Sequence, residues 1–236
     1  MKRVKFFIGV LCIGLLFTAC SDSDEETTKH VSNSYYVEYE TLKTLYEGNS
    51  IDNVTAFLES KGFERYSQTA ITQTEDKVVY MKVNDGETVV FHLCVDNTNN
   101  TIKSLHYYIP DESKSELLNV FNAYSSALQK VYSSAGYNGV LLTYNSGEKM
   151  YGSHSSFLNA LNKSSVSTIY MAQEVYTLAN DRIGLTYAPM DEQDILPAEE
   201  SNQEKKPIIG LCDRSVFNKN RSSSQSYYVY IFIEKK

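Results

Sequence analysis

The chain has 236 residues, a formal charge of −7 and a hydrophobic content of 42%, values typical of a globular protein of one or two domains. The acidic balance argues against nucleic acid as a partner, because phosphate binding needs clustered Lys and Arg. Four cysteines are too few for a disulfide-stabilised scaffold. The common motifs of hydrolases, zinc peptidases, dithiol oxidoreductases and nucleotide-binding proteins do not occur, so the sequence assigns no catalytic residue and no cofactor.

The first residues have the pattern of an export signal. Lys2, Arg3 and Lys5 precede an uninterrupted apolar run at 6–17. Twelve apolar residues are too few to span the hydrocarbon of a bilayer, which needs about 20 helical residues. We therefore expect residues 1–19 to be a signal peptide that takes no part in the fold.

The end of this run, Leu16 to Ala19 followed by Cys20, resembles the lipobox of bacterial lipoproteins. The acidic stretch behind it, residues 21–26 (SDSDEE), is similar to the surface-export leader of Bacteroidota lipoproteins. The resemblance covers residues 1–26. It implies lipid attachment at Cys20 and an outer-membrane location, facing the cell surface or, alternatively, the periplasm. Loss of residues 1–19, which hold three basic and no acidic residues, would bring the formal charge to −10.

After Cys20 the polar residues 20–34 predict a flexible acidic tether, and the folded body is expected at 35–236. Only Cys94 and Cys212 then remain as thiols. Outside the cytoplasm these two can form a disulfide that closes a long loop. The alternative is that both are buried and unpaired, as small apolar side chains.

The first half of the body predicts one helix followed by a meander of strands. Ser50 is a helix N-cap candidate, and Gly62 has the position of a left-handed C-terminal residue, so we expect a helix between them. Strands are predicted at 65–74, 78–83, 87–95 and 101–109. The Asn84-Asp85-Gly86 sequence is a strong hairpin signal between the second and third of these.

The first half is expected to end with a long helix that begins after Pro110 and ends at Gly136. Ser113 and Glu116 have capping-box spacing. Its core stripe is predicted to contain Leu117, Phe121, Tyr124, Leu128 and Val131. A short helix at 153–163 and strands at 166–178, 183–188, 208–212 and 227–233 follow. The last strand is apolar on both faces, which is typical of the centre of a sheet.

These elements predict an α+β fold with antiparallel strands and packed helices. They form two α-β-β-β units, 35–136 and 137–236, which either share one sheet or form two small domains. The architecture resembles the repeated α-β modules of bacterial periplasmic and inhibitor-like domains. That resemblance implies a fold and assigns no activity.

Few residues have a pattern that indicates metal binding or catalysis. His92 and His106 are predicted to lie opposite each other on neighbouring strands, close enough to share a metal, but no third ligand is identifiable, so no metal site is assigned. The acidic segment 191–204 offers Ca²⁺ ligands without a binding-loop motif, and a solvated loop is the favoured interpretation. His154 lies among serines at a helix start, where capping is favoured over catalysis.

Tyrosine is abundant, with 19 residues and no tryptophan. Tyrosines suit both exposed binding faces and half-buried strands. A binding face is hypothesised at Tyr107, Tyr108, Tyr227 and Tyr228, with packing in the sheet as the alternative. The expected function is a membrane-anchored, non-enzymatic binding or interaction module with an unknown protein or glycan ligand. A hydrolase with dispersed catalytic residues and an accessory subunit of an envelope complex remain alternatives.

Overall fold

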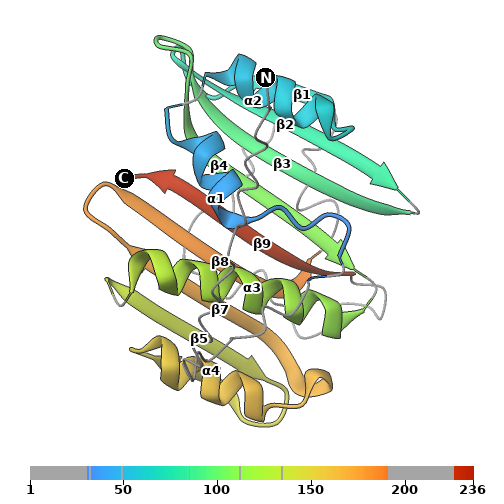
Figure 1. The fold of residues 1–236 in the computed structure, drawn as a ribbon, viewed down its shortest axis with the longest axis vertical. Helices are drawn as coiled ribbons and strands as arrows, with labels where there is room; N and C mark the ends of the chain where they lie inside the picture. Colours follow the sequence, from blue (N-terminus) through green and yellow to red (C-terminus); the bar gives the residue numbers. More distant parts are fainter. Residues whose placement is uncertain are drawn as a thin grey trace, which may run out of the picture.

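All nine strands of the described residues form one antiparallel sheet, and all four of their α-helices lie on the same face of it (Figure 1). The computed structural model describes residues 31–190 and 226–236, except 32, 49, 85, 112 and 134. The predicted α+β class with antiparallel strands is confirmed.

The helices are α1 (Tyr39–Tyr46), α2 (Ile51–Ser60), α3 (Lys114–Tyr132) and α4 (His154–Lys163), and a short 3₁₀ helix, η1 (Val166–Thr168), follows α4. The strands are β1 (Glu64–Ala70), β2 (Glu75–Asn84), β3 (Glu87–Asp96), β4 (Thr101–Asp111), β5 (Tyr137–Thr143), β6 (Gly147–Tyr151), β7 (Ile169–Thr177), β8 (Asp181–Met190) and β9 (Ser226–Lys235). Their order across the sheet is β1-β2-β3-β4-β9-β8-β7-β5-β6, so β1 and β6 are the edges.

The two halves of the chain are joined by strand pairing. β4 pairs with β9 along its length, from Ser104 opposite Glu234 to Asp111 opposite Tyr227. The halves therefore share one continuous sheet. β9 is the central strand, as its apolar sequence predicted. The segments at 191–204 and 208–212, to which we assigned a loop and a strand, lie outside the described residues.

Helix α2 has both predicted ends. The Ser50 side chain accepts a hydrogen bond from the backbone N–H of Asn53. At the other end Gly62 has a φ of +80°, and the N–H of Phe63 donates to the carbonyl of Leu58. The side chains of Phe63 and Leu58 are both buried, which completes a hydrophobic Schellman end.

Helix α3 is shorter than predicted. Ser113 caps its start, accepting from the N–H of Glu116, but it ends at Tyr132 and not at Gly136. Ser133 has a φ of +52° and a ψ of −118°, a conformation outside the helical region, so the helix ends there. The predicted stripe is fully buried apart from its last member, Val131, which is 36% exposed.

The sequence patterns missed four elements, one of which is η1, which occupies the start of the strand predicted at 166–178. Helix α1 and the hairpin of β5 and β6 were not predicted, although Gly147 has a φ of +70° and sits at the turn of that hairpin. The β2–β3 hairpin, by contrast, was predicted; its connection has two residues, because Asn84 pairs with Glu87, and Gly86 has a φ of +86°.

Several tyrosines span the helix–sheet interface. Their rings fill the core, and their hydroxyls reach polar groups at its margin. Tyr107 donates to the carbonyl of Tyr35, and Tyr124 donates to that of Val37 at 2.7 Å. Tyr46 of α1 donates to a carboxylate oxygen of Asp181 at 2.9 Å. The tyrosines thus fix the segment before α1, and α1 itself, to the sheet.

Candidate functional site

The predicted histidine pair is on the face of the sheet that carries none of the described helices. His92 of β3 lies directly opposite His106 of β4, as predicted. The His106 ring contacts the Tyr230 hydroxyl through Nδ1 at 2.5 Å and stacks on the Tyr230 ring. Burial lowers the pKa of His106 to about 3, which keeps its imidazole neutral. The described residues contain no group of three or more His, Cys, Asp or Glu side chains placed to hold a metal ion.

The four tyrosines of the hypothesised binding face do not share a face. Tyr107 and Tyr227 are buried in the core beneath the helices, whereas Tyr108 and Tyr228 lie with Val79 on the opposite side. Consecutive residues of a strand point to opposite faces, so each Tyr-Tyr pair is divided between them. Three of the four are less than 9% exposed, and the expectation of one tyrosine surface made by all four is wrong.

Cys94 is the single cysteine among the described residues, and it is half-buried on β3. Burial raises the pKa of its thiol, which makes it less reactive as a nucleophile. Cys20 and Cys212 lie outside the described residues. Lipidation at Cys20 and the Cys94–Cys212 disulfide therefore stay predictions.

Residues of the types found in hydrolytic active sites do contact one another, but they lie inside the core. We call Ser125, Tyr137, His154 and Glu174 the Glu174 cluster; they come from α3, β5, α4 and β7. The Ser125 Oγ lies 2.8 Å from His154 Nε2 and donates to Glu174 Oε1 at 3.0 Å. The Tyr137 hydroxyl donates to the same carboxyl oxygen at 3.1 Å. From the sequence we singled out His154 but not its partners. Each partner lies within 29 residues of His154 along the chain but belongs to a different helix or strand.

This arrangement differs from a catalytic triad. The same imidazole atom, His154 Nε2, faces both the serine and Glu174, at 3.5 Å from Glu174 Oε1, whereas a triad uses the two ring nitrogens separately. Ser125 and Glu174 are both fully buried, so their side chains are closed to a substrate. Burial raises the pKa of Glu174 to about 7, with the hydroxyls of Ser125 and Tyr137 opposing that rise.

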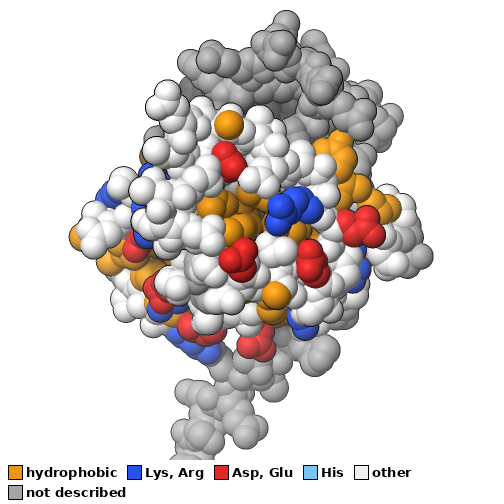
Figure 2. All heavy atoms as spheres, turned by 90° about the horizontal axis from the view of Figure 1, so that it is seen from above, with side chains coloured by type: hydrophobic (Ala, Val, Ile, Leu, Met, Phe, Trp, Pro, Cys, Tyr) orange, Lys and Arg blue, Asp and Glu red, His pale blue; other side chains and the backbone are white. Residues whose placement is uncertain are grey.

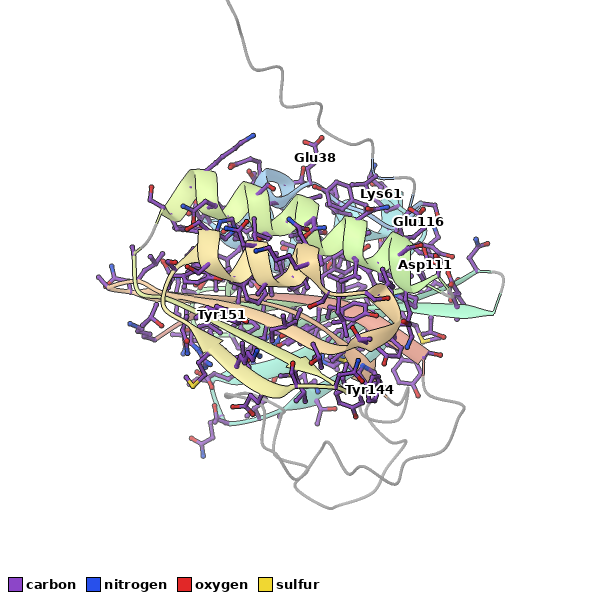
Figure 3. All side chains as sticks on the ribbon, turned by 90° about the horizontal axis from the view of Figure 1, so that it is seen from below. Glu38, Lys61, Asp111, Glu116, Tyr144 and Tyr151 are labelled. Atoms are coloured by element: carbon purple, nitrogen blue, oxygen red, sulfur yellow. The ribbon has the colours of Figure 1, made fainter. Side chains whose placement is uncertain are left out.

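A second cluster lies at the surface, where the β5–β6 turn meets the start of α3. Tyr144 follows β5 and is 62% exposed, the one aromatic residue among the large exposed hydrophobic side chains of the described ranges. Its ring packs edge-on against Tyr170, with centroids 5.2 Å apart, and its hydroxyl lies 3.3 Å from that of Tyr227. Figure 3 shows Tyr144 at one end of the strands and Tyr151 toward the other.

Beneath this exposed ring lies a polar group with no partner. Tyr187 of β8 packs beside Tyr227, with ring centroids 5.1 Å apart, and is fully buried. Its hydroxyl has no hydrogen-bond partner among the described residues. Lys114, the first residue of α3, places its ammonium 3.8 Å from the centre of the Tyr227 ring. We call Tyr144, Tyr170, Tyr187, Tyr227 and Lys114 the tyrosine cluster.

The tyrosine cluster has the composition of a binding surface. It combines an exposed aromatic ring, a cation stacked on a second ring and a buried hydroxyl. Of its members, sequence reasoning singled out only Tyr227. Tyr170 is the extra residue at an irregularity of the β5–β7 pairing, where Leu142 faces Met171 and Thr143 faces Ile169. No periodic pattern could reveal such a position, and the hairpin turn that places Tyr144 was itself missed.

The surface at the α2 and β1 end of the molecule is mixed in charge. Figure 2 shows acidic and basic side chains interspersed there, with hydrophobic side chains between them. No helix within the described ranges is long and apolar enough to cross a membrane. Comparison of the chain with protein-family models, curated proteins and solved structures finds no match.

Proposed function

We propose that this chain is a lipid-anchored, non-enzymatic binding module of the bacterial outer membrane, facing the cell surface, and that the tyrosine cluster contacts its protein or glycan ligand. The observation that supports this proposal best is the pairing of an exposed ring, Tyr144, with the buried and unpartnered hydroxyl of Tyr187. A buried polar group without a partner is costly in a folded protein and needs an explanation. Tyr187 is fully buried in the free protein, so a ligand group supplies the missing hydrogen bond only if the side chains above it move on binding.

The chemistry of the cluster favours recognition over catalysis. Tyrosine contributes a large contact area at a low cost in side-chain entropy, and it is enriched at the centres of interfaces. A phenol hydroxyl can hydrogen-bond to a peptide or to a sugar, and its ring can stack on either. Lys114 adds a donor at the margin of the same surface. None of these groups is a nucleophile activated by an adjacent base.

The position of the cluster suits a protein tethered at its N-terminus. Asn33 donates to a carboxylate oxygen of Asp111 at 2.9 Å, and Asp111 pairs with Tyr227 across β4 and β9. The chain thus enters the fold at the same end of the sheet as the tyrosine cluster. Asn33 is thirteen positions after Cys20. Such a length spans at most about 45 Å, so an acyl chain at Cys20 would keep the cluster near the membrane.

The alternative of a hydrolase draws no support from the Glu174 cluster. Hydrolysis needs a nucleophile that a substrate can reach and donors for the oxyanion. Ser125 is fully enclosed by α3, α4 and β7, and its contacts are with His154 and Glu174.

The binding proposal is tested with glycan and peptide arrays, probed with the full-length protein in detergent. We expect the wild-type protein to retain at least one probe, and Tyr144→Ala to reduce that binding at least tenfold, equivalent to about 1.4 kcal/mol. Met150→Ala is the matched control, because Met150 is 67% exposed on the neighbouring strand β6. Equal binding by Tyr144→Ala and the wild-type protein, or no retained probe, would contradict the proposal.

The anchor is tested separately in cells fed an alkyne-labelled palmitate. The wild-type chain should incorporate the label and become sensitive to protease added to intact cells, whereas Cys20→Ala should incorporate none. Label on the Cys20→Ala protein would show that the lipid is attached elsewhere. Protease resistance of the labelled wild-type protein would place it on the periplasmic side.

A further inference from the structure

The Glu174 cluster has a one-directional chain of hydrogen bonds. Ser125 has one proton to donate, and it donates to Glu174 Oε1. The contact between Ser125 Oγ and His154 Nε2 then requires an N–H on Nε2, so the imidazole donates to the serine. Tyr137 also donates to Oε1. The other carboxyl oxygen, Glu174 Oε2, is buried and has no partner among the described residues.

No Lys or Arg of the described ranges compensates this carboxyl group. The elements packed around it are α3, α4, β5 and β7. The titratable groups that face it are His154 of α4, Tyr137 of β5 and Tyr176 of β7, and proximity to Glu174 raises the pKa of both tyrosines. An ionised Glu174 would therefore be a fully buried anion supported only by neutral donors, which is a costly state.

We propose that Glu174 and His154 form a proton-compensating pair that keeps α4 docked on the sheet at constant strength in mildly acidic conditions. In the folded protein the carboxyl group holds a proton on Oε2 and the imidazole is neutral. In the unfolded chain the carboxylate is ionised and the imidazole carries that proton. Folding breaks one N–H bond and forms one O–H bond, so the pair binds one proton in both states.

The directions of the pKa shifts agree with this geometry. Burial raises the pKa of Glu174 from 4.5 to about 7 and lowers the pKa of His154 below 6.5. The raised carboxyl pKa adds stability that is complete below pH 4.5 and is lost as the pH rises to about 7. The lowered imidazole pKa has the opposite effect, because stability is lost as the pH falls below 6.5. The two trends cancel where both groups titrate, which is below pH 6.5 and above the lowered pKa of His154 in the folded protein.

Two single substitutions should therefore produce opposite pH dependences. Relative to the wild-type protein, Glu174→Gln leaves only the imidazole trend, so its unfolding constant should fall by up to about tenfold per pH unit as the pH rises towards 6.5. His154→Gln leaves only the carboxyl trend, so its unfolding constant should rise by up to about tenfold per pH unit from 4.5 to about 7. The double variant should regain the wild-type pH dependence.

Denaturant unfolding and amide hydrogen exchange of α4 measure these dependences. Glu64→Gln is the control, because Glu64 is exposed on the edge strand β1, and it should leave the wild-type profile unchanged. Single variants that are destabilised equally at every pH would overturn the proposal, since that result indicates a merely structural role. Slopes of the same sign in both single variants would also overturn it.

The wild-type protein provides a test that does not depend on the folding of any variant. Infrared difference spectra should show the C=O stretch of one buried, protonated carboxyl group at about pH 6, and this band should be lost above about pH 8. Absence of the band at pH 6 would overturn the proposal. None of these measurements involves the tyrosine cluster, so their outcome is independent of the proposed binding function.

Discussion

The Glu174 cluster and the tyrosine cluster are connected by the same strand but differ in access to solvent. β5 begins with Tyr137, which hydrogen-bonds to Glu174, and Tyr144 follows directly after its end. The residues with catalytic potential are buried between the helices and the sheet, whereas the tyrosine cluster has one exposed ring, that of Tyr144. The comparison shows that residue type alone does not locate a functional site, because solvent access decides which groups a ligand can reach.

The two clusters also differ in hydrogen bonding. In the Glu174 cluster Ser125, Tyr137 and His154 each have a polar partner, although one carboxyl oxygen does not. In the tyrosine cluster the buried Tyr187 hydroxyl has none within the described part of the chain. We therefore expect substitutions in the first cluster to change stability and those in the second to change binding.

The largest effect is expected for His154→Ala. It removes a buried ring that packs edge-on against Tyr137, with centroids 5.8 Å apart, and that donates to Ser125. The lost packing and hydrogen bond should lower the free energy of unfolding by about 2–4 kcal/mol. Chemical denaturation at neutral pH measures this change. Ser155→Ala, on the exposed side of the same helix, should remain within about 0.5 kcal/mol of the wild-type value.

Ser125→Ala should have the next largest effect. The alanine leaves both His154 Nε2 and Glu174 Oε1 without the serine hydroxyl in a fully buried site. We expect a loss of about 1–3 kcal/mol in the free energy of unfolding. The neighbouring Ser126 is exposed, and Ser126→Ala serves as the control for helix propensity. Equal stability of the two variants would show that the hydrogen-bond chain contributes nothing.

A matched pair of Tyr→Phe substitutions separates the two clusters most directly. Tyr137→Phe removes a hydroxyl that donates to Glu174 and should cost about 1–2 kcal/mol. Tyr187→Phe removes a buried hydroxyl that has no partner in the described structure, so stability should be unchanged or slightly increased. Thermal unfolding compares them. A larger loss for Tyr187→Phe than for Tyr137→Phe would mean that the Tyr187 hydroxyl is hydrogen-bonded in the free protein.

Tyr144→Ala should also have only a small effect on stability. Most of the ring is exposed, so its removal should change the free energy of unfolding by less than about 0.5 kcal/mol. The same variant should lose binding to any probe that the wild-type protein retains. A marked drop in its melting temperature would show that Tyr144 is a packing residue and would weaken the contrast between the clusters.

Local sequence signals predicted much of the fold. Ser50, Gly62 and Ser113 mark helix ends through hydrogen bonds and backbone conformations that involve only neighbouring residues. The β2–β3 hairpin is determined by its turn in the same way, and the cross-strand pairing of His92 with His106 follows from the length of the loop between β3 and β4.

Prediction from the sequence failed for features that depend on contacts between distant parts of the chain. α1 is a short helix held by core packing and by the Tyr46–Asp181 hydrogen bond, between residues 135 positions apart. The predicted tyrosine face was divided because alternate residues of a strand face opposite sides, and sequence alone does not say that helices cover only one of them.

The sequence by itself determined the class of fold, the central position of β9 and the chain segments that form most helices and strands. These features depend on alternation, capping and turn chemistry, which act over a few residues. Only the tertiary structure decided that both halves share one sheet, that Ser125, His154 and Glu174 meet in the core, and that Tyr144 is exposed above Tyr187 and Tyr227. Those contacts join distant segments, and burial and hydrogen bonding in the assembled core give each residue its role.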